Sequence, residues 1–189
     1  MSSEEDSKQH IKISVLGKSL VGKSALTYRF ISDKFPTEHD TTVEDQYKTF
    51  VNVDGFNCEL EILDTAGQDD YQTMLDTWID FGNCFLLVYA IDDDDSFQEA
   101  KIKYERITEL KKGQKYSIIL VGNKSDLPDS SRKVQKTDVD NYAVNVGILN
   151  IEASALEKYN VREAFIEVVH DYLLKNKKGS GRMFDCPCF

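Results

Sequence analysis

The order of apolar and polar residues along the chain predicts six strands. Residues 84–91 and 117–121 are nearly continuous apolar runs, which is typical of strands covered on both faces. Residues 47–53 and 56–63 alternate apolar and polar positions around Asp54-Gly55, and this pattern predicts a hairpin with a two-residue turn. The six predicted strands are residues 11–16, 47–53, 56–63, 84–91, 117–121 and 148–152.

Helical spacing of apolar residues predicts helices between these strands, at residues 25–31, 96–110, 137–146 and 161–174. Ser96 and Glu99 are spaced as a capping box, so the second of these helices is expected to begin at Ser96. Strands that alternate with helices predict an α/β fold of three layers, α/β/α. Its six-stranded sheet is mostly parallel, and the hairpin supplies one antiparallel edge strand. Loops at the carboxyl ends of the parallel strands build the ligand site in such folds.

A glycine-containing loop joins the first predicted strand to the first helix. It reads Gly17-Lys18-Ser19-Leu20-Val21-Gly22-Lys23-Ser24, which is glycine, four residues and then Gly-Lys-Ser. Such a loop directs backbone N–H groups at a phosphate chain, and the helix behind it adds partial positive charge. Lys23 can reach the outer phosphates, and the Ser24 hydroxyl can ligate Mg²⁺. The alternative is a loop that only turns a strand into a helix, but the strand before it and the helix after it favour phosphate binding.

Two further motifs follow predicted strands. Asp64-Thr65-Ala66-Gly67-Gln68 comes at the end of the hairpin, where Asp64 can hold Mg²⁺ through water. The N–H of Gly67 can approach a γ-phosphate, and Gln68 can orient an attacking water. Asn123-Lys124-Ser125-Asp126 follows strand 117–121. The Asp126 carboxylate can accept two hydrogen bonds from the N1–H and 2-amino groups of guanine, a pair that adenine lacks.

Composition and charge remove several classes of function. With 41% hydrophobic and 30% charged residues, the 189 residues suffice for one soluble domain with a sizeable core. The net charge is −10; four basic residues and one acidic residue lie beyond position 174, so the rest of the chain carries −13. This acidic body disfavours nucleic acid as a partner. The four cysteines have no zinc or disulfide spacing, and Cys58 and Cys84 are expected in the core.

Two segments bear on location and on metal binding. The acidic start of the chain is not a signal peptide, and no apolar stretch reaches transmembrane length, so a cytosolic protein is expected. The run Asp92-Asp93-Asp94-Asp95 either holds a metal ion or places carboxylates at the amino end of the next helix. The second reading is favoured because that placement is stabilising in itself.

Taken together, the motifs make the chain similar to the Ras-superfamily small GTPases over about residues 10–174 and the tail. Leu63-Asp64 before Thr-Ala-Gly-Gln resembles the Ras/Rap branch, as does the effector-like segment Thr42-Val43-Glu44-Asp45-Gln46-Tyr47-Lys48. The resemblance implies a P-loop GTPase fold with about five helices. We expect a disordered extension at 1–9, a GTP-binding domain at 10–174 and a flexible basic tail at 175–189. The implied function is a monomeric switch that binds GTP or GDP with Mg²⁺ and, alone, hydrolyses GTP slowly.

The resemblance also implies roles for single residues. Thr42 would ligate Mg²⁺ and donate its N–H to the γ-phosphate, acting in catalysis with Lys23 and Gln68. Asn123 and Lys124 would brace the base and the phosphate loop. The nucleotide-binding residues implied are Gly17, Ser19, Leu20, Val21, Gly22, Lys23, Ser24, Ala25, Phe35, Thr42, Gly67, Asn123, Lys124, Asp126, Ser154, Ala155 and Leu156. Among them Phe35 would pack against the guanine edge, and the Ala155 N–H would meet the guanine carbonyl oxygen. The implied metal ligands are Ser24, Thr42 and, through water, Asp64.

Several positions depart from the family's pattern, among them His39, where Ras has a tyrosine, and Thr41, which replaces a proline. Ser19 and Leu20 stand where Ras proteins have two glycines, and Leu156 replaces the usual lysine. We hypothesise that the Ser19 hydroxyl crowds the arginine finger of a GTPase-activating protein, which is worth about 10³–10⁵ in rate. The predicted switches, 39–47 and 67–77, contain no arginine, so an activating protein is expected to supply one. A guanine nucleotide exchange factor is expected as well, together with effector domains that add a strand at the edge between Val43 and Lys48.

The chain ends in Cys186-Pro187-Cys188-Phe189, which fits a prenylation box. Cys186 would be the acceptor, and the final Phe189 favours geranylgeranyl over farnesyl. A terminal cysteine without modification is the alternative. One lipid gives marginal anchoring, which the basic tail supports. The expected location is the cytoplasmic face of a membrane, most simply the plasma membrane, with a cytosolic pool.

Two other functions remain open. A P-loop kinase or ATPase is disfavoured by Asp126, and displacement of bound guanine nucleotide by ATP would reveal one. An adaptor that holds GTP without hydrolysing it is disfavoured by Gln68, and single-turnover hydrolysis distinguishes it from an enzyme.

Overall fold

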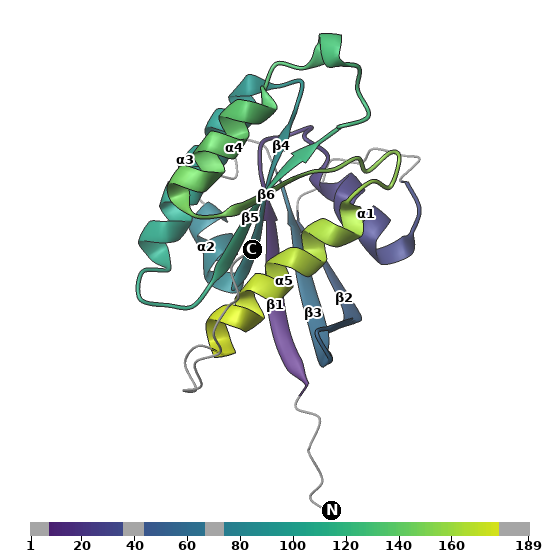
Figure 1. Ribbon diagram of the computed structural model, residues 1–189. Coiled ribbons are helices and arrows are strands. Elements are labelled where there is room, and N and C mark those ends of the chain that lie inside the picture. The colour runs from purple at the N-terminus through teal and green to yellow at the C-terminus, as the bar shows by residue number, and fades with distance from the viewer. Residues whose placement is uncertain (1–7, 36–43, 67–73, 178–189) are drawn as a thin grey trace, which may run out of the picture.

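The computed structural model describes residues 8–35, 44–66 and 74–177 (Figure 1). The strands in these ranges are β1 (Gln9–Leu16), β2 (Glu44–Val53), β3 (Phe56–Thr65), β4 (Cys84–Ala90), β5 (Ser117–Asn123) and β6 (Leu149–Glu152). The α-helices are α1 (Lys23–Ser32), α2 (Leu75–Phe81), α3 (Asp94–Leu110), α4 (Lys136–Val146) and α5 (Val161–Lys177). None of the helices in the described part is long and apolar enough to cross a membrane.

The six strands form one sheet in the order β2-β3-β1-β4-β5-β6. Only the pair β2–β3 is antiparallel, and all other neighbours are parallel. The β2–β3 turn has positive φ at both central residues, 51° at Asp54 and 83° at Gly55, as a two-residue hairpin turn requires. The predicted sheet, with one antiparallel edge strand, is therefore confirmed.

Helices cover both faces of the sheet. One core contains Leu26 of α1 and Phe165 of α5, and the other contains Trp78 of α2, Phe97 of α3 and Val139 of α4. In Figure 1, α5 runs across the near face of the sheet, and α2 and α3 lie on the other side. The three-layer α/β/α architecture is thus confirmed. Because β4 and β5 are buried along their whole length, their carboxyl ends are rigid supports for the loops that follow.

The predicted capping box at Ser96 is wrong, because α3 begins two residues earlier. Asp93 is the N-cap, and its side chain accepts a hydrogen bond from the Ser96 N–H. The Ser96 hydroxyl is buried instead, donating to the Asp93 carbonyl at 2.6 Å and accepting the Ala90 N–H at 3.0 Å. Asp94 and Asp95 occupy the first helical turn, so the acidic run does place carboxylates at a helix amino end.

The remaining differences concern element ends and one short helix. The sequence pattern gave no range for α2, a helix of seven residues that buries Trp78 and Ile79. Helix α5 continues through Lys177, so the first three residues of the predicted tail are helical. Cys58 and Cys84 are buried free thiols, as expected.

Candidate functional site

Close approach of the backbone to its neighbours explains two glycines of the phosphate loop between β1 and α1. A Cβ on Gly17 would lie 2.1 Å from the carbonyl oxygen of Val88 on β4. A Cβ on Gly22 would lie 2.2 Å from Asn123 Nδ2, and the φ of Gly22 is +94°. No side chain fits at either position, so the loop is pressed against the ends of β4 and β5.

Lys23 lies under this loop in the first turn of α1 and is only 5% exposed. Its Nζ donates to the carbonyl oxygens of Gly17 at 3.0 Å and Lys18 at 2.9 Å. Burial lowers the pKa of Lys23 to about 8, and the carboxylate of Asp64 acts in the opposite direction. The loop therefore holds a buried positive charge whose direct partners, among the described residues, are neutral carbonyl groups.

Asp64 provides the opposite charge at the end of β3 and is 1% exposed. Both of its carboxylate oxygens are buried, and neither accepts a hydrogen bond of normal geometry in the described part of the chain. Burial raises the pKa of Asp64 to about 6, while the nearby Ser24 hydroxyl and Lys23 ammonium oppose that shift. A buried carboxylate in this condition is costly unless a further group binds it.

Asn123 connects the phosphate loop to the loop after β6. Its Nδ2 donates to the Val21 carbonyl at 2.8 Å, and its Oδ1 accepts the Ala155 N–H at 3.2 Å. Asn123 is buried, so both bonds are shielded from water. The N–H that the resemblance assigns to the guanine carbonyl is therefore held by Asn123 in this structure.

Lys124 and Asp126 follow Asn123 in the loop after β5. Asp126 is exposed and accepts a short hydrogen bond from the Ser154 hydroxyl, which leaves acceptor capacity toward solvent. Lys124 has a φ of +66°, and its Nζ lies 3.2 Å from Asp92 Oδ1. The first residue of the acidic run thus pairs with the base-recognition loop.

Other predicted site residues differ in their exposure. Leu20 is 89% exposed with a φ of +65°, a conformation that favours glycine, and Leu156 is 52% exposed. Phe35 is half-buried against the core shared by α1 and α5, and Ala25 is buried in α1. The predictions for Thr42, Gly67, Gln68 and Cys186 lie outside the described residues.

Sequence reasoning missed two residues that contact the site. The guanidinium of Arg29, on α1, donates to the carbonyl oxygens of Ala155 and Leu156. Lys18 in the phosphate loop pairs with Asp93, at 3.2 Å from Nζ to Oδ2. In each case the partner is at least 75 positions away along the chain. No local pattern distinguishes such residues from ordinary solvated charges.

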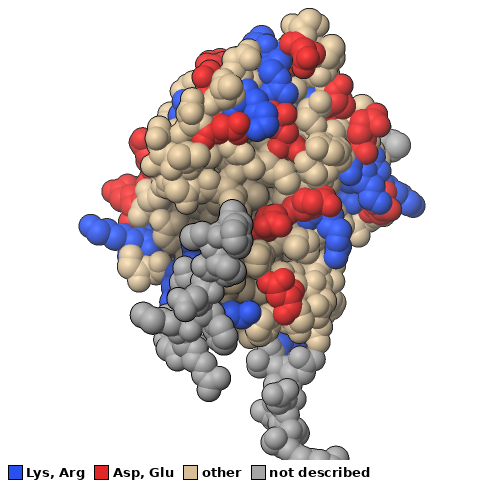
Figure 2. Space-filling model, in the orientation of Figure 1, with Lys and Arg blue, Asp and Glu red and all other residues tan. Residues whose placement is uncertain are grey.

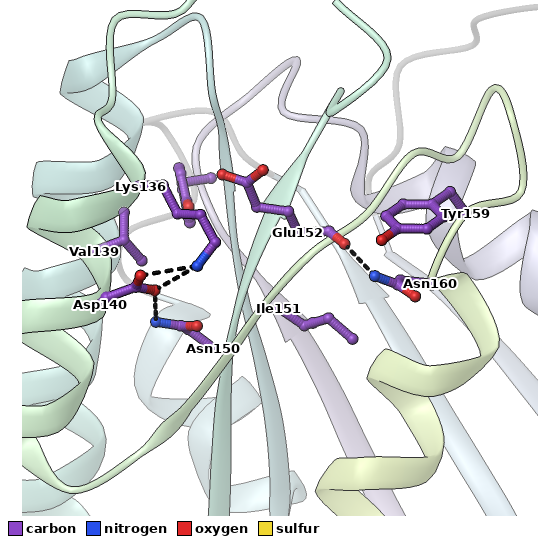
Figure 3. A pocket seen from close by; sticks show the side chains of 9 residues that line it. Lys136, Val139, Asp140, Asn150, Ile151, Glu152, Tyr159 and Asn160 are labelled. Atoms are coloured by element: carbon purple, nitrogen blue, oxygen red, sulfur yellow. Dashed lines mark hydrogen bonds and ion pairs between the residues drawn. The ribbon is translucent and has the colours of Figure 1, made fainter.

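A separate cavity of about 280 Å³ lies between α4, β6 and the start of α5 (Figure 3). Asp140 accepts hydrogen bonds there from Lys136 and Asn150, and the Asn160 side chain donates to the Glu152 carbonyl. None of the described residues of the three predicted motifs lines this cavity. It is therefore distinct from the candidate nucleotide site.

P-loop proteins bind nucleotide phosphates with a lysine buried beneath a glycine loop, beside a buried carboxylate at the end of the neighbouring strand of the sheet. The geometry thus defines the class as the P-loop nucleotide-binding proteins.

Comparison with known proteins narrows this class. The model of the Ras family matches residues 12–174, and the chain belongs to that family. It is 42% identical over 171 residues to the Ras-like protein rasB of Dictyostelium discoideum, covering 90% of this chain and 86% of that protein. It is 37% identical over 190 residues to the human Ras-related protein R-Ras, covering 94% of this chain and 85% of that protein. The Ras-like protein rasC of Dictyostelium discoideum is 40% identical over 161 residues, 85% of each chain. The predicted resemblance is confirmed, and the chain is a small GTP-hydrolysing protein of the Ras type.

Proposed function

We propose that the chain is a Mg²⁺-dependent switch that binds GDP or GTP in this site and converts GTP and water to GDP and phosphate. The observation that carries the proposal is the position of Asn123, whose side chain bonds Val21 of the phosphate loop and Ala155 of the loop after β6. One buried amide thereby fixes the separation of the two loops. Such a fixed separation suits a ligand with a phosphate chain at one end and a base at the other.

The groups around Lys23 suit a magnesium ion. Asp64 has two buried carboxylate oxygens without a normal hydrogen-bond partner, and the Ser24 hydroxyl lies close enough to affect its pKa. Oxygen ligands of this kind are those that Mg²⁺ prefers. Ser24 would ligate the ion directly, Asp64 through water, and Thr42 from outside the described residues. The ion would neutralise charge on the β- and γ-phosphates.

Lys23 is the described residue with the clearest catalytic role. The Gly17 and Lys18 carbonyls already hold its ammonium in place, so little reorganisation is needed when phosphate enters. Burial strengthens its interaction with the developing negative charge. Gln68 would orient the water molecule that attacks the γ-phosphate. Because the predicted switches contain no arginine, the reaction of the chain alone is slow, and an activating protein accelerates it.

Partners and location follow from the edge strand and the tail. Strand β2 pairs only with β3, so its outer edge between Glu44 and Lys48 can accept a strand from an effector. An exchange factor would speed the release of GDP. Acidic and basic side chains are interleaved on the face in Figure 2, and the net charge of −10 argues against nucleic acid as a partner. Prenylation at Cys186 would hold a monomer at the cytoplasmic face of the plasma membrane.

Identification of the nucleotide that co-purifies with the protein tests the proposal. We expect GDP or GTP, and single-turnover hydrolysis of GTP that stops when Mg²⁺ is chelated. The Asp126→Asn variant should lose GDP and gain xanthosine diphosphate, because the amide donates where xanthine has a carbonyl. Protein that purifies without nucleotide and gives no heat on titration with GDP contradicts the proposal. Displacement of GDP by ATP would favour an ATPase, and stable GTP would favour an adaptor.

A further inference from the structure

Arg29 lies two turns beyond the phosphate loop on α1 and crosses to the opposite end of the site. Its Nε donates to the Ala155 carbonyl at 2.8 Å, and its Nη2 donates to the Leu156 carbonyl at 2.6 Å. The remaining nitrogen, Nη1, donates to the Asp33 carbonyl at 3.1 Å, just after the same helix. All three nitrogens of one planar fork are therefore used, each on a backbone carbonyl.

The guanidinium also lies beside the ring of Phe35, with its central carbon 5.8 Å from the ring centroid. Phe35, Ala155 and Leu156 are three of the residues expected to surround the guanine base. One side chain thus contacts all three of them. Among the residues that the structure describes, no other side chain joins these three residues through hydrogen bonds and a cation–π contact.

The position of Arg29 is itself fixed by packing. Its neighbour Phe30 stacks on Phe165 of α5, with ring centroids 4.2 Å apart and planes within 9°. Lys158, in the loop between β6 and α5, forms an ion pair with Asp33 at the end of α1. Helix α1 is therefore a rigid support that begins at the phosphates, with Lys23, and ends at the base.

We propose that Arg29 is a positioning residue for guanine recognition, which holds the peptide groups at 155–156 and the Phe35 ring in place before the base arrives. The inference rests on the proposed function, because it assigns a base to the space beside these groups. Asn123 holds the N–H of Ala155, and Arg29 holds its carbonyl. The peptide groups on both sides of Ala155 are thus fixed, and the cost of ordering them is met in the free protein.

The geometry of arginine is needed for this task. A planar fork can bind two successive carbonyl groups and lie beside a ring, whereas a lysine ammonium is a single point on a flexible stem. The Leu156 side chain is 52% exposed, whereas its backbone carbonyl accepts a hydrogen bond from Arg29, so the contact that holds this residue is made by its backbone.

Nucleotides altered at one atom of the base test the proposal. The full-length protein and its Arg29→Met, Arg29→Lys and Arg106→Met variants are titrated with GDP, 6-thio-GDP and IDP. In 6-thio-GDP a sulfur replaces the carbonyl oxygen that would share the Ala155 N–H with Asn123 Oδ1. IDP lacks only the 2-amino group that would face Asp126. Arg106 is a matched control because it also makes three hydrogen bonds, to Asp76 in the predicted second switch and to Glu109, and neither partner is a nucleotide-binding residue.

The wild-type protein should prefer GDP over 6-thio-GDP by about fivefold, the worth of one neutral hydrogen bond. In Arg29→Met, affinity for GDP should fall about tenfold and this preference should shrink to less than twofold, since the 155–156 peptides are no longer fixed. The preference for GDP over IDP should stay near the wild-type value, because it depends on Asp126. The preference of Arg29→Lys for GDP over 6-thio-GDP should lie between those of the wild-type protein and Arg29→Met.

Two results would overturn the inference. One is an unchanged preference for GDP over 6-thio-GDP in Arg29→Met. The other is a loss of this preference in Arg106→Met that equals the loss in Arg29→Met. If Arg29→Met fails to fold by circular dichroism, an unchanged preference in Arg29→Lys counts against it in the same way. Absence of GDP binding by the wild-type protein contradicts the proposed function itself, and is thus distinguishable from failure of this inference.

Discussion

Replacement of Gly22 by alanine should destabilise the nucleotide-free protein far more than the same change at Gly55 or Gly113, two glycines that also have positive φ. The new methyl group would lie 2.2 Å from Asn123 Nδ2, well inside van der Waals contact. Because Gly22 is the N-cap of α1 and its chain neighbours Val21 and Lys23 are both buried, the backbone has little room to move. The Asn123 side chain must therefore be displaced.

The magnitude follows from the bonds that Asn123 would lose. A non-glycine residue at a φ of +94° costs about 1–2 kcal/mol. The bonds to Val21 and Ala155 contribute about 1 kcal/mol each, and a buried amide left unpaired costs about 1–3 kcal/mol more. Alanine recovers about 0.5–1 kcal/mol through the unfolded chain. The free energy of unfolding should therefore fall by about 3–6 kcal/mol.

Urea denaturation of the nucleotide-free protein measures this change, and the chain supplies its own controls. Gly55 and Gly113 have φ values of +83° and +80°, and a Cβ on either would meet nothing within 4 Å. Gly55→Ala and Gly113→Ala should therefore cost only about 1 kcal/mol, the conformational term alone. If Gly22→Ala unfolds within 1 kcal/mol of Gly113→Ala, the coupling between the phosphate loop and Asn123 has been misjudged.

Three further predictions concern the same site. Leu20→Gly should leave stability unchanged or raise it by up to about 1 kcal/mol in urea denaturation, because Leu20 is 89% exposed at a φ of +65° and loses almost no packing. Asp64→Asn should stabilise the nucleotide-free protein by about 1–3 kcal/mol in the same assay, since it removes a buried unsatisfied charge, yet weaken Mg²⁺-dependent GDP binding in calorimetry. Lys18→Met should raise the GDP dissociation rate two- to fivefold in a fluorescent-nucleotide chase at low salt, and the increase should be smaller at 0.5 M salt. The matched ion-pair variant Lys175→Met should leave the GDP dissociation rate unchanged.

The sheet was predictable because each of its strands carries its own signal. The runs at β4 and β5 are apolar throughout, and Asp54-Gly55 marks the hairpin without reference to the rest of the chain. Helix α2 was not predicted because seven residues give only two turns, too few for helical periodicity to stand out. The start of α3 was misplaced because several acidic residues and Ser96 are all good caps, and tertiary contacts select Asp93 among them.

The phosphate loop and the Asn123–Asp126 motif were predictable for a similar reason: both are contiguous and both follow strands. The contacts that hold them together were not. Arg29 meets Ala155 across 126 positions, and Lys18 meets Asp93 across 75. An arginine on a helix is most simply read as a solvated charge, and only the folded chain shows that its fork is spent on backbone carbonyls. Long-range positioning contacts of this kind leave no spacing in the sequence.

The free protein keeps two buried charges that its own groups satisfy only in part. Lys23 is bonded to neutral carbonyls, and Asp64 has no normal hydrogen-bond partner within the described ranges. Burial shifts the pKa of each toward its neutral form, so the burial of each charge is destabilising in itself. The rigid contacts of Asn123 and Arg29 hold the loops in place despite that cost. If the chain binds nucleotide and Mg²⁺ as proposed, a phosphate chain and a divalent ion would supply the missing opposite charges. Their binding should then relieve both groups at once and add its free energy to the stability of the fold.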